Sequence, residues 1–131
     1  MHSTVIDRWH AYMAARDPSG LDSLIADDCV FQSPAVHSPQ HGKAVTIKYL
    51  TAAMQTLGTP DFTYVEEWIG DRSAVLEFTL TLDGMSLNGV DIIHWNDAGQ
   101  ITNFRVMVRP IKGLMALIPA MAAKLGMTAV A

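Results

Sequence analysis

Apolar residues in the first half of the chain recur three and four positions apart, the spacing of one face of an α-helix. The pattern predicts a first helix that ends near Pro18, a short second helix over Leu21–Ala26 and a long third helix over Lys43–Leu57. Gly58 follows the third helix as a C-terminal stop. Cys29–Phe31 has the composition of a brief strand. We therefore expect three N-terminal helices around one short strand.

From residue 62 onward the hydrophobic period changes to two, which is typical of strands. Three short segments with turn chemistry separate the apolar runs and favour hairpins between antiparallel strands. The predicted strands are Phe62–Ile69, Ala74–Leu82, Met85–Trp95 and Ile101–Val108. Pro110 should end this meander, and Ile111–Leu125 has the pattern of a closing helix. Pro119 should break or kink that helix, because proline removes an interior hydrogen bond.

Composition narrows the class of protein. A chain of 131 residues, half of them hydrophobic, fits one domain over residues 1–131. The net charge of −4 and nine scattered Lys and Arg residues argue against nucleic acid as a partner. No apolar stretch is long enough to span a membrane, and the first residues do not resemble a signal peptide. A single cysteine, Cys29, excludes an internal disulfide framework, so we expect a cytoplasmic protein.

Three stretches make the predicted order of elements specific. They are Ile25–Pro34, His41–Lys43 and Val90–Ile101. Together they resemble the nuclear transport factor 2-like superfamily, in particular its SnoaL-like and ketosteroid isomerase-like branches. The resemblance covers nearly the whole chain. It implies an α+β fold in which a cone-shaped, curved antiparallel sheet wraps against the three N-terminal helices and leaves an apolar pocket. Because this fold serves isomerases, cyclases, hydrolases and non-catalytic binders, it does not by itself name a reaction.

Strand alternation and the resemblance together predict which residues face the pocket. Successive strand residues point to opposite faces, so Phe78 and its neighbours two positions away share one side. A pocket of this kind suits a small apolar ligand held by a few polar groups. The expected substrate-binding residues are Trp9, Met13, Tyr49, Leu76, Phe78, Leu80, Ile93, Phe104, Val106 and Val108. For Tyr49, a core or interface position is the alternative.

Asp91 is the strongest candidate for chemistry. The resemblance places it where ketosteroid isomerase keeps a protonated aspartate that donates a hydrogen bond to a developing enolate. An isolated carboxyl among apolar side chains should have a raised pKa, because burial disfavours its charged form. The alternative is a structural aspartate that is hydrogen-bonded to a neighbouring loop.

The partner base of the isomerase is missing from its expected position. The family's Asp-Pro after the first strand is Ser33-Pro34 in this chain, and Trp9 occupies the place of the tyrosine donor. His37 and His41 lie in the loop near the expected pocket mouth and are candidate catalytic bases. The alternative to a catalytic role is that both are solvated loop histidines. No acidic or cysteine ligand accompanies them in the loop, so we expect no metal, and the resemblance implies no cofactor.

Three hypotheses remain open at this point. The first is an isomerase-, cyclase- or lyase-type enzyme that uses Asp91 as an acid or hydrogen-bond donor. The second is a non-catalytic protein that binds a small ligand, and the third is a dimerisation module. In each case we expect a homodimer through the outer sheet face, which should carry Glu77, Thr79, Thr81, His94, Arg105 and Arg109. The methionine-rich tail, with Met115, Met121 and Met127, has the composition of a soft apolar lid.

Overall fold

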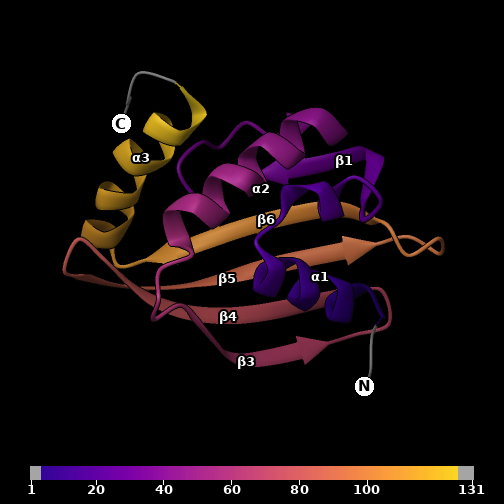
Figure 1. The fold of residues 1–131 in the computed structure, drawn as a ribbon, viewed down its shortest axis with the longest axis horizontal. Helices are drawn as coiled ribbons and strands as arrows, with labels where there is room; N and C mark the ends of the chain where they lie inside the picture. The colour runs from indigo at the N-terminus through magenta and orange to yellow at the C-terminus, as the bar shows by residue number, and fades with distance from the viewer. Residues whose placement is uncertain (1–3, 127–131) are drawn as a thin grey trace.

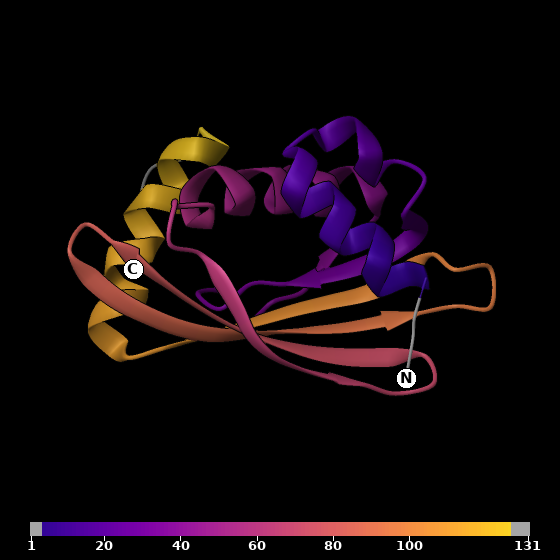
Figure 2. The same cartoon turned by 60° about the horizontal axis from the view of Figure 1, so that its bottom comes forward.

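Three α-helices cover one face of a curved, six-stranded sheet in the computed structural model, which describes residues 4–126 (Figure 1). Seen from a second direction, the helices lie together on one side of the strands and leave the other side bare (Figure 2). The elements are α1 (Thr4–Ala15), the 3₁₀ helix η1 (Pro18–Leu21), β1 (Ile25–Gln32), β2 (Gln40–His41), α2 (Lys43–Leu57), β3 (Thr63–Ile69), β4 (Ser73–Leu82), β5 (Met85–Trp95), β6 (Ile101–Arg109) and α3 (Ile111–Leu125).

The sheet has the strand order β2-β1-β6-β5-β4-β3. The four C-terminal strands form the predicted antiparallel meander, while β1 joins its edge parallel to β6. The sheet is therefore mixed, and it is open because β2 and β3 lie at opposite edges. This arrangement confirms the predicted α+β class with a curved sheet packed against helices.

Alternation along the long strands sets the two faces of the sheet. In β4, Leu76, Phe78 and Leu80 are buried, whereas Glu77 and Thr79 between them are partly exposed. The register places Leu76 opposite Asp91 of β5, and Asp91 opposite Val106 of β6. The inward face therefore brings the inner residues of three strands into adjacent rows beneath the helices.

The predicted helix over Leu21–Ala26 is wrong. η1 ends at Leu21, and β1 already begins at Ile25. The apolar spacing in this segment resembles a helical face, but all of its large apolar residues are buried and the backbone pairs with β6, where Ile25 lies opposite Ile101. Pairing with the sheet therefore overrides a local pattern that is weak in so short a segment. β2, a strand of two residues, lies inside what the sequence indicated as a loop.

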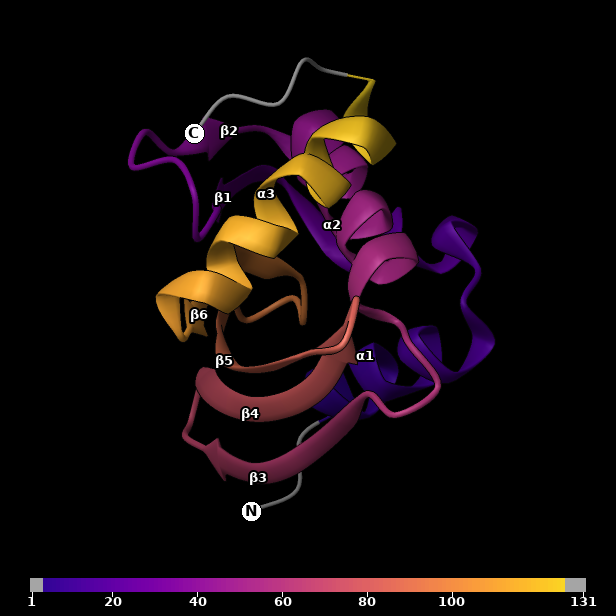
Figure 3. The same ribbon diagram turned by 90° about the vertical axis from the view of Figure 1, so that its left-hand side faces the viewer.

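The sequence predicted that Pro119 breaks or kinks the last helix, and the structure shows that it does not break it. α3 continues from Ile111 to Leu125 and ends at Gly126, which has a φ of 70°. Pro119 and Met115, one turn earlier, are both exposed, so the carbonyl that loses its partner lies on the solvent side. When the molecule is turned so that its left-hand side in Figure 1 faces the viewer, α3 lies beside α2 above the concave side of the strands (Figure 3). Met127, the last methionine of the predicted lid, lies outside the described residues.

Candidate functional site

Asp91 lies on the inward face of β5 and is buried, with 7% of its surface exposed. Its neighbours in the sheet are Leu76 on one side and Val106 on the other, so no charged residue flanks it across either strand. Residue 89, two positions before it, is glycine for a packing reason. A Cβ at this position would come within 2.5 Å of the Phe78 ring, so only glycine lets Phe78 pack over β5.

A chain of hydrogen bonds fixes the orientation of the Asp91 carboxyl. The indole Nε1 of Trp9 donates to the hydroxyl of Tyr64 at 2.9 Å. The Tyr64 hydroxyl in turn donates to Oδ2 of Asp91 at 2.6 Å. No described residue donates to the other oxygen, Oδ1, and Asp91 lines a cavity. Oδ1 is therefore the carboxyl oxygen that is still available to a ligand.

Burial sets the ionisation of this pair. Desolvation raises the pKa of Asp91 from 3.8 to about 7, although the hydrogen bond from Tyr64 opposes the rise. The pKa of Tyr64 is raised well above 10, first by burial and then by the Asp91 charge. Tyr64 therefore remains a hydrogen-bond donor at neutral pH. Asp91 is present in both its acid and its carboxylate forms near pH 7.

Two adjoining cavities lie beneath the helices. The inner one, of about 30 Å³, contains Asp91 and is lined by Trp9, Met13, Leu50, Ala53, Met54, Leu57, Gly58, Phe62, Tyr64, Phe78, Asp91, Phe104 and Val106. The second, of about 150 Å³, lies between α2, α3 and the end of β1 and is almost wholly apolar. Ala53, Leu57 and Val106 line both. An apolar ligand in the second cavity would therefore reach toward Asp91.

Most of the residues predicted to face the pocket lie in one of these walls. Trp9, Met13, Phe78 and Phe104 line the inner cavity, Tyr49 lines the second, and Val106 lines both. The other four predicted residues line neither cavity. Three of them, Leu76, Leu80 and Ile93, are buried in the core beneath the cavities. Val108 borders an outer groove. Inward-facing strand residues near the middle of the core are covered by other side chains, so alternation alone cannot separate lining from filling.

The structure does not bring the two candidate histidines to Asp91. His37 is exposed and borders the outer groove that contains Val108, and His41 is exposed on β2 opposite Val30. Neither lines either cavity, so the geometry gives the catalytic role predicted for them no support. Ser33 does line the second cavity, but its hydroxyl accepts hydrogen bonds from the backbone N–H groups of Ala35 and Val36 and shapes the turn after β1.

Tyr64, which holds the carboxyl in place, was not among the residues predicted from the sequence. A signal existed in its alternation with Phe62, because both residues line the inner cavity. Among the described residues, no group of three or more His, Cys, Asp or Glu side chains is arranged to hold a metal ion. No helix in the described part of the chain is long and apolar enough to cross a membrane.

Comparisons with known proteins agree with this architecture. A steroid delta-isomerase from Pseudomonas aeruginosa superposes with a TM-score of 0.88 and 38% identity, over 93% of this chain and 89% of that chain. An uncharacterised protein with a cystatin-like fold from Silicibacter pomeroyi has a TM-score of 0.85 and 29% identity, over 92% and 84% of the two chains.

A nuclear transport factor 2-like protein of unknown function from Mesorhizobium loti shares the fold, with a TM-score of 0.70 and 21% identity, over 81% and 88% of the chains. No curated protein matches the sequence. The family model for the SnoaL-like domain matches residues 6–104, which is most of the chain. The chain therefore belongs to the SnoaL-like domain family.

Proposed function

We propose that this protein is an isomerase- or cyclase-type enzyme for a small apolar carbonyl compound, with Asp91 as its acid or hydrogen-bond donor. The observation that carries the proposal is the Asp91 carboxyl itself. It lies in an apolar cavity, is held by Tyr64 through one oxygen, and has a pKa near neutrality. Membership of the SnoaL-like family, and a fold shared with a steroid delta-isomerase and a putative polyketide cyclase, support this class of reaction.

The chemistry follows from the two oxygens of Asp91. Because Oδ2 already accepts a hydrogen bond from Tyr64, we place the acidic proton on Oδ1, the oxygen that has no donor in the described structure. From there it would donate to the carbonyl oxygen of a substrate. As a proton leaves the adjacent carbon, negative charge develops on that oxygen, and a donor already in position stabilises it without reorganisation. A general acid works best when its pKa lies near the working pH, and a value of about 7 meets this condition.

The proton from carbon also needs an acceptor. Asp91 is the only Asp, Glu, His or Lys among the described residues that line the two cavities. We therefore assign this acceptor to water or to a group on the substrate, rather than to a second side chain. The same observation favours a second candidate function, in which the protein binds an apolar ligand without transforming it.

The two functions are separated by following proton exchange in a simple ketone. Cyclohexanone in D₂O exchanges its α-protons when it is enolised, and cyclohex-3-enone becomes a conjugated enone that absorbs in the ultraviolet. We expect the wild-type protein to accelerate both processes. Asp91→Leu should lower either rate by about 100-fold, the order expected for one positioned donor. Asp91→Asn, which keeps an N–H donor, should retain more activity than the leucine variant.

Activity should also fall as the pH rises above 7, because the carboxylate form of Asp91 has no proton to donate. Ligand binding by saturation-transfer NMR, without exchange in either ketone, would favour the binding protein instead. Equal rates in the wild type and the leucine variant would remove Asp91 from the chemistry.

A further inference from the structure

We infer that the substrate carries an anionic group, such as a carboxylate, and that Arg16 binds it at the mouth of the Asp91 cavity. The inference rests on the proposed function, because it describes the far end of the same ligand. It names a binding residue and a substrate class that neither the sequence nor the comparisons indicated.

The inner cavity adjoins a recess between the ends of α1 and α2 and the start of β3. The recess has a volume of about 240 Å³. Its lining shares five residues with the Asp91 cavity: Met13, Met54, Gly58, Phe62 and Tyr64. Tyr64 therefore lies against both spaces, and a ligand that accepts a hydrogen bond from Asp91 Oδ1 has room to extend into the recess.

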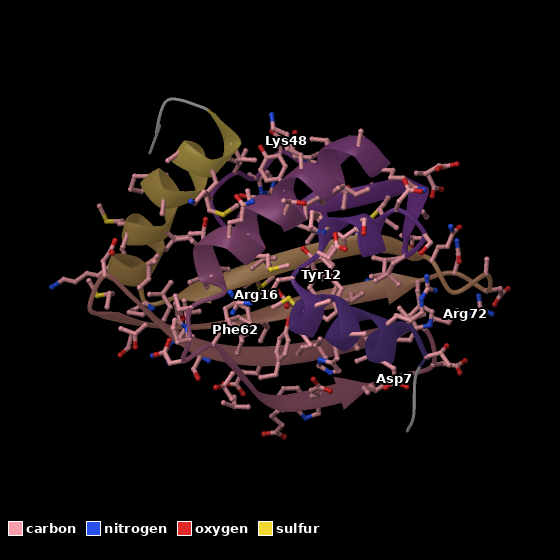
Figure 4. The ribbon with its side chains drawn as sticks, viewed as in Figure 1. Asp7, Tyr12, Arg16, Lys48, Phe62 and Arg72 are labelled. Carbon is pink, nitrogen blue, oxygen red and sulfur yellow. The ribbon has the colours of Figure 1, made fainter. Side chains whose placement is uncertain are left out.

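Arg16 is the only charged residue among those that line this recess. Its side chain comes from the end of α1 and lies near Phe62 (Figure 4). Although Arg16 is exposed, no described acidic residue forms an ion pair with it. The guanidinium is a planar donor that matches a carboxylate with two parallel hydrogen bonds, so an unpaired Arg16 is suited to such a group.

The backbone places Arg16 in an unusual way. Its φ of 55° lies in the left-handed region, which residues with a Cβ adopt infrequently, and its N–H donates to the Tyr12 carbonyl at 2.9 Å as α1 ends. The chain turns back at this point, and the guanidinium lies over Gly58. A Cβ added at Gly58 would come within 3.3 Å of the Arg16 Nη1 atom. The same Cβ would come within 2.4 Å of the Met54 carbonyl oxygen, so glycine is needed here first for the end of α2, and it also leaves Arg16 room beside the recess.

The two cavities and the recess lie next to one another in a row. The apolar cavity under α3 adjoins the Asp91 cavity, which adjoins the Arg16 recess. A matching substrate has an apolar body, a carbonyl group near its middle and an anion at the opposite end. In this arrangement the anionic group of the substrate stays at the exposed mouth beside Arg16. It therefore does not bring water to the Asp91 carboxyl.

The test uses matched probes that differ only in charge. Benzoylalkanoates of three chain lengths carry an aryl ketone and a carboxylate, and their primary amides are neutral partners of the same shape. Dissociation constants are measured by calorimetry for the wild type, Arg16→Met, Arg16→Lys and Lys48→Met. Lys48 is an exposed cation on α2 that lies away from Arg16, so its variant controls for a general loss of positive charge (Figure 4).

We expect the wild type to bind at least one carboxylate about 10-fold more tightly than its amide, as one charge-assisted contact allows. This preference should disappear in Arg16→Met, persist in part in Arg16→Lys and be unchanged in Lys48→Met. Amide affinity should be the same in all four proteins, which also shows that the variants are folded. Equal affinity of the wild type for acids and amides would overturn the Arg16 inference while leaving the proposed function intact. Failure of every probe to bind the wild type would overturn both.

Discussion

At the scale of single residues, the protein keeps a carboxyl where water cannot solvate its charge. Asp91 has only a neutral tyrosine as a hydrogen-bonding partner, and no cation balances it in the described structure. A side chain in this position stabilises the fold less when it is ionised than when it is protonated. We therefore treat Asp91 as a residue retained at a cost to stability, and this cost can be measured.

The pH dependence of stability tests that cost. Below about pH 4, Asp91 is protonated in both the folded and the unfolded states. Between about pH 4 and pH 7 the unfolded chain ionises first, so stability falls across this window and levels off above it. At about 1.4 kcal/mol per pKa unit, the fall amounts to about 4 kcal/mol. Asp91→Asn cannot ionise but keeps an oxygen for Tyr64.

We therefore expect the stability of Asp91→Asn, relative to the wild type, to rise by several kcal/mol between pH 4.5 and pH 8. Urea unfolding of both proteins at a series of pH values measures this difference, and all other titrating groups cancel in the comparison. A difference that does not change with pH would show that Asp91 ionises as easily in the fold as in water.

At the scale of elements, the long strands and helices could be predicted because each repeats its pattern over many residues. The meander and the helix over Lys43–Leu57 were found in this way. Short elements could not be predicted in this way. The segment Leu21–Ala26 is too short for its helical spacing to outweigh the pairing of its backbone with β6. Asp91 was found because the family resemblance places an aspartate at this position of the third long strand. Arg16 was not, because its orientation depends on a single backbone turn.

Tyr64 shows why a site can be missed inside a correctly predicted strand. The pairing of β3 with β4 shifts register between Tyr64 and Glu66, so a bulge lies between them. Counting back from Ile69 by twos places Tyr64 on the outer face. The bulge reverses this and aims Tyr64 at Asp91. Alternation with Phe62 is the one local sign of this orientation, because the residues between Tyr64 and Glu66 do not mark the bulge itself.

The end of β1 determines whether a base can act on the ligand. Ser33 lines the apolar cavity, and its hydroxyl accepts from the N–H groups of Ala35 and Val36. An aspartate makes the same turn contacts with one oxygen and leaves the other free. Ser33→Asp should therefore add a general base and accelerate isomerisation of cyclohex-3-enone by about 100-fold.

Ser33→Asn is the matched control, because it preserves the turn and adds no base. Its rate should equal that of the wild type, measured by the same ultraviolet absorbance. If the aspartate and asparagine variants react equally slowly, the missing base is not what limits this chain.

At the scale of the whole molecule, the helices cover one face of the sheet and the other face is bare (Figure 2). The register brings Trp68, Val75 and Ile92 into one row across β3, β4 and β5 on this outer face. Half of the Trp68 surface is exposed. Val90 and Met107 form a second apolar pair, with polar residues such as Glu77 and His94 around them. Such a face has the composition of a protein interface, with an apolar centre and a polar rim.

We propose that two copies pair through this outer face, because a self-complementary patch generates a closed dimer and a broad sheet face can bury a standard interface. Light scattering at micromolar concentration should give twice the mass of one chain. Ile92→Lys places a charge at the centre of the patch and should yield a monomer.

The exposed apolar residues of α3 are the competing surface, and Met115, 64% exposed, represents them. Met115→Lys should remain dimeric. Circular dichroism of both variants confirms that they are folded before their masses are compared. A monomeric wild type would contradict the dimer, whereas dissociation of Met115→Lys with Ile92→Lys intact would move the interface from the sheet to α3.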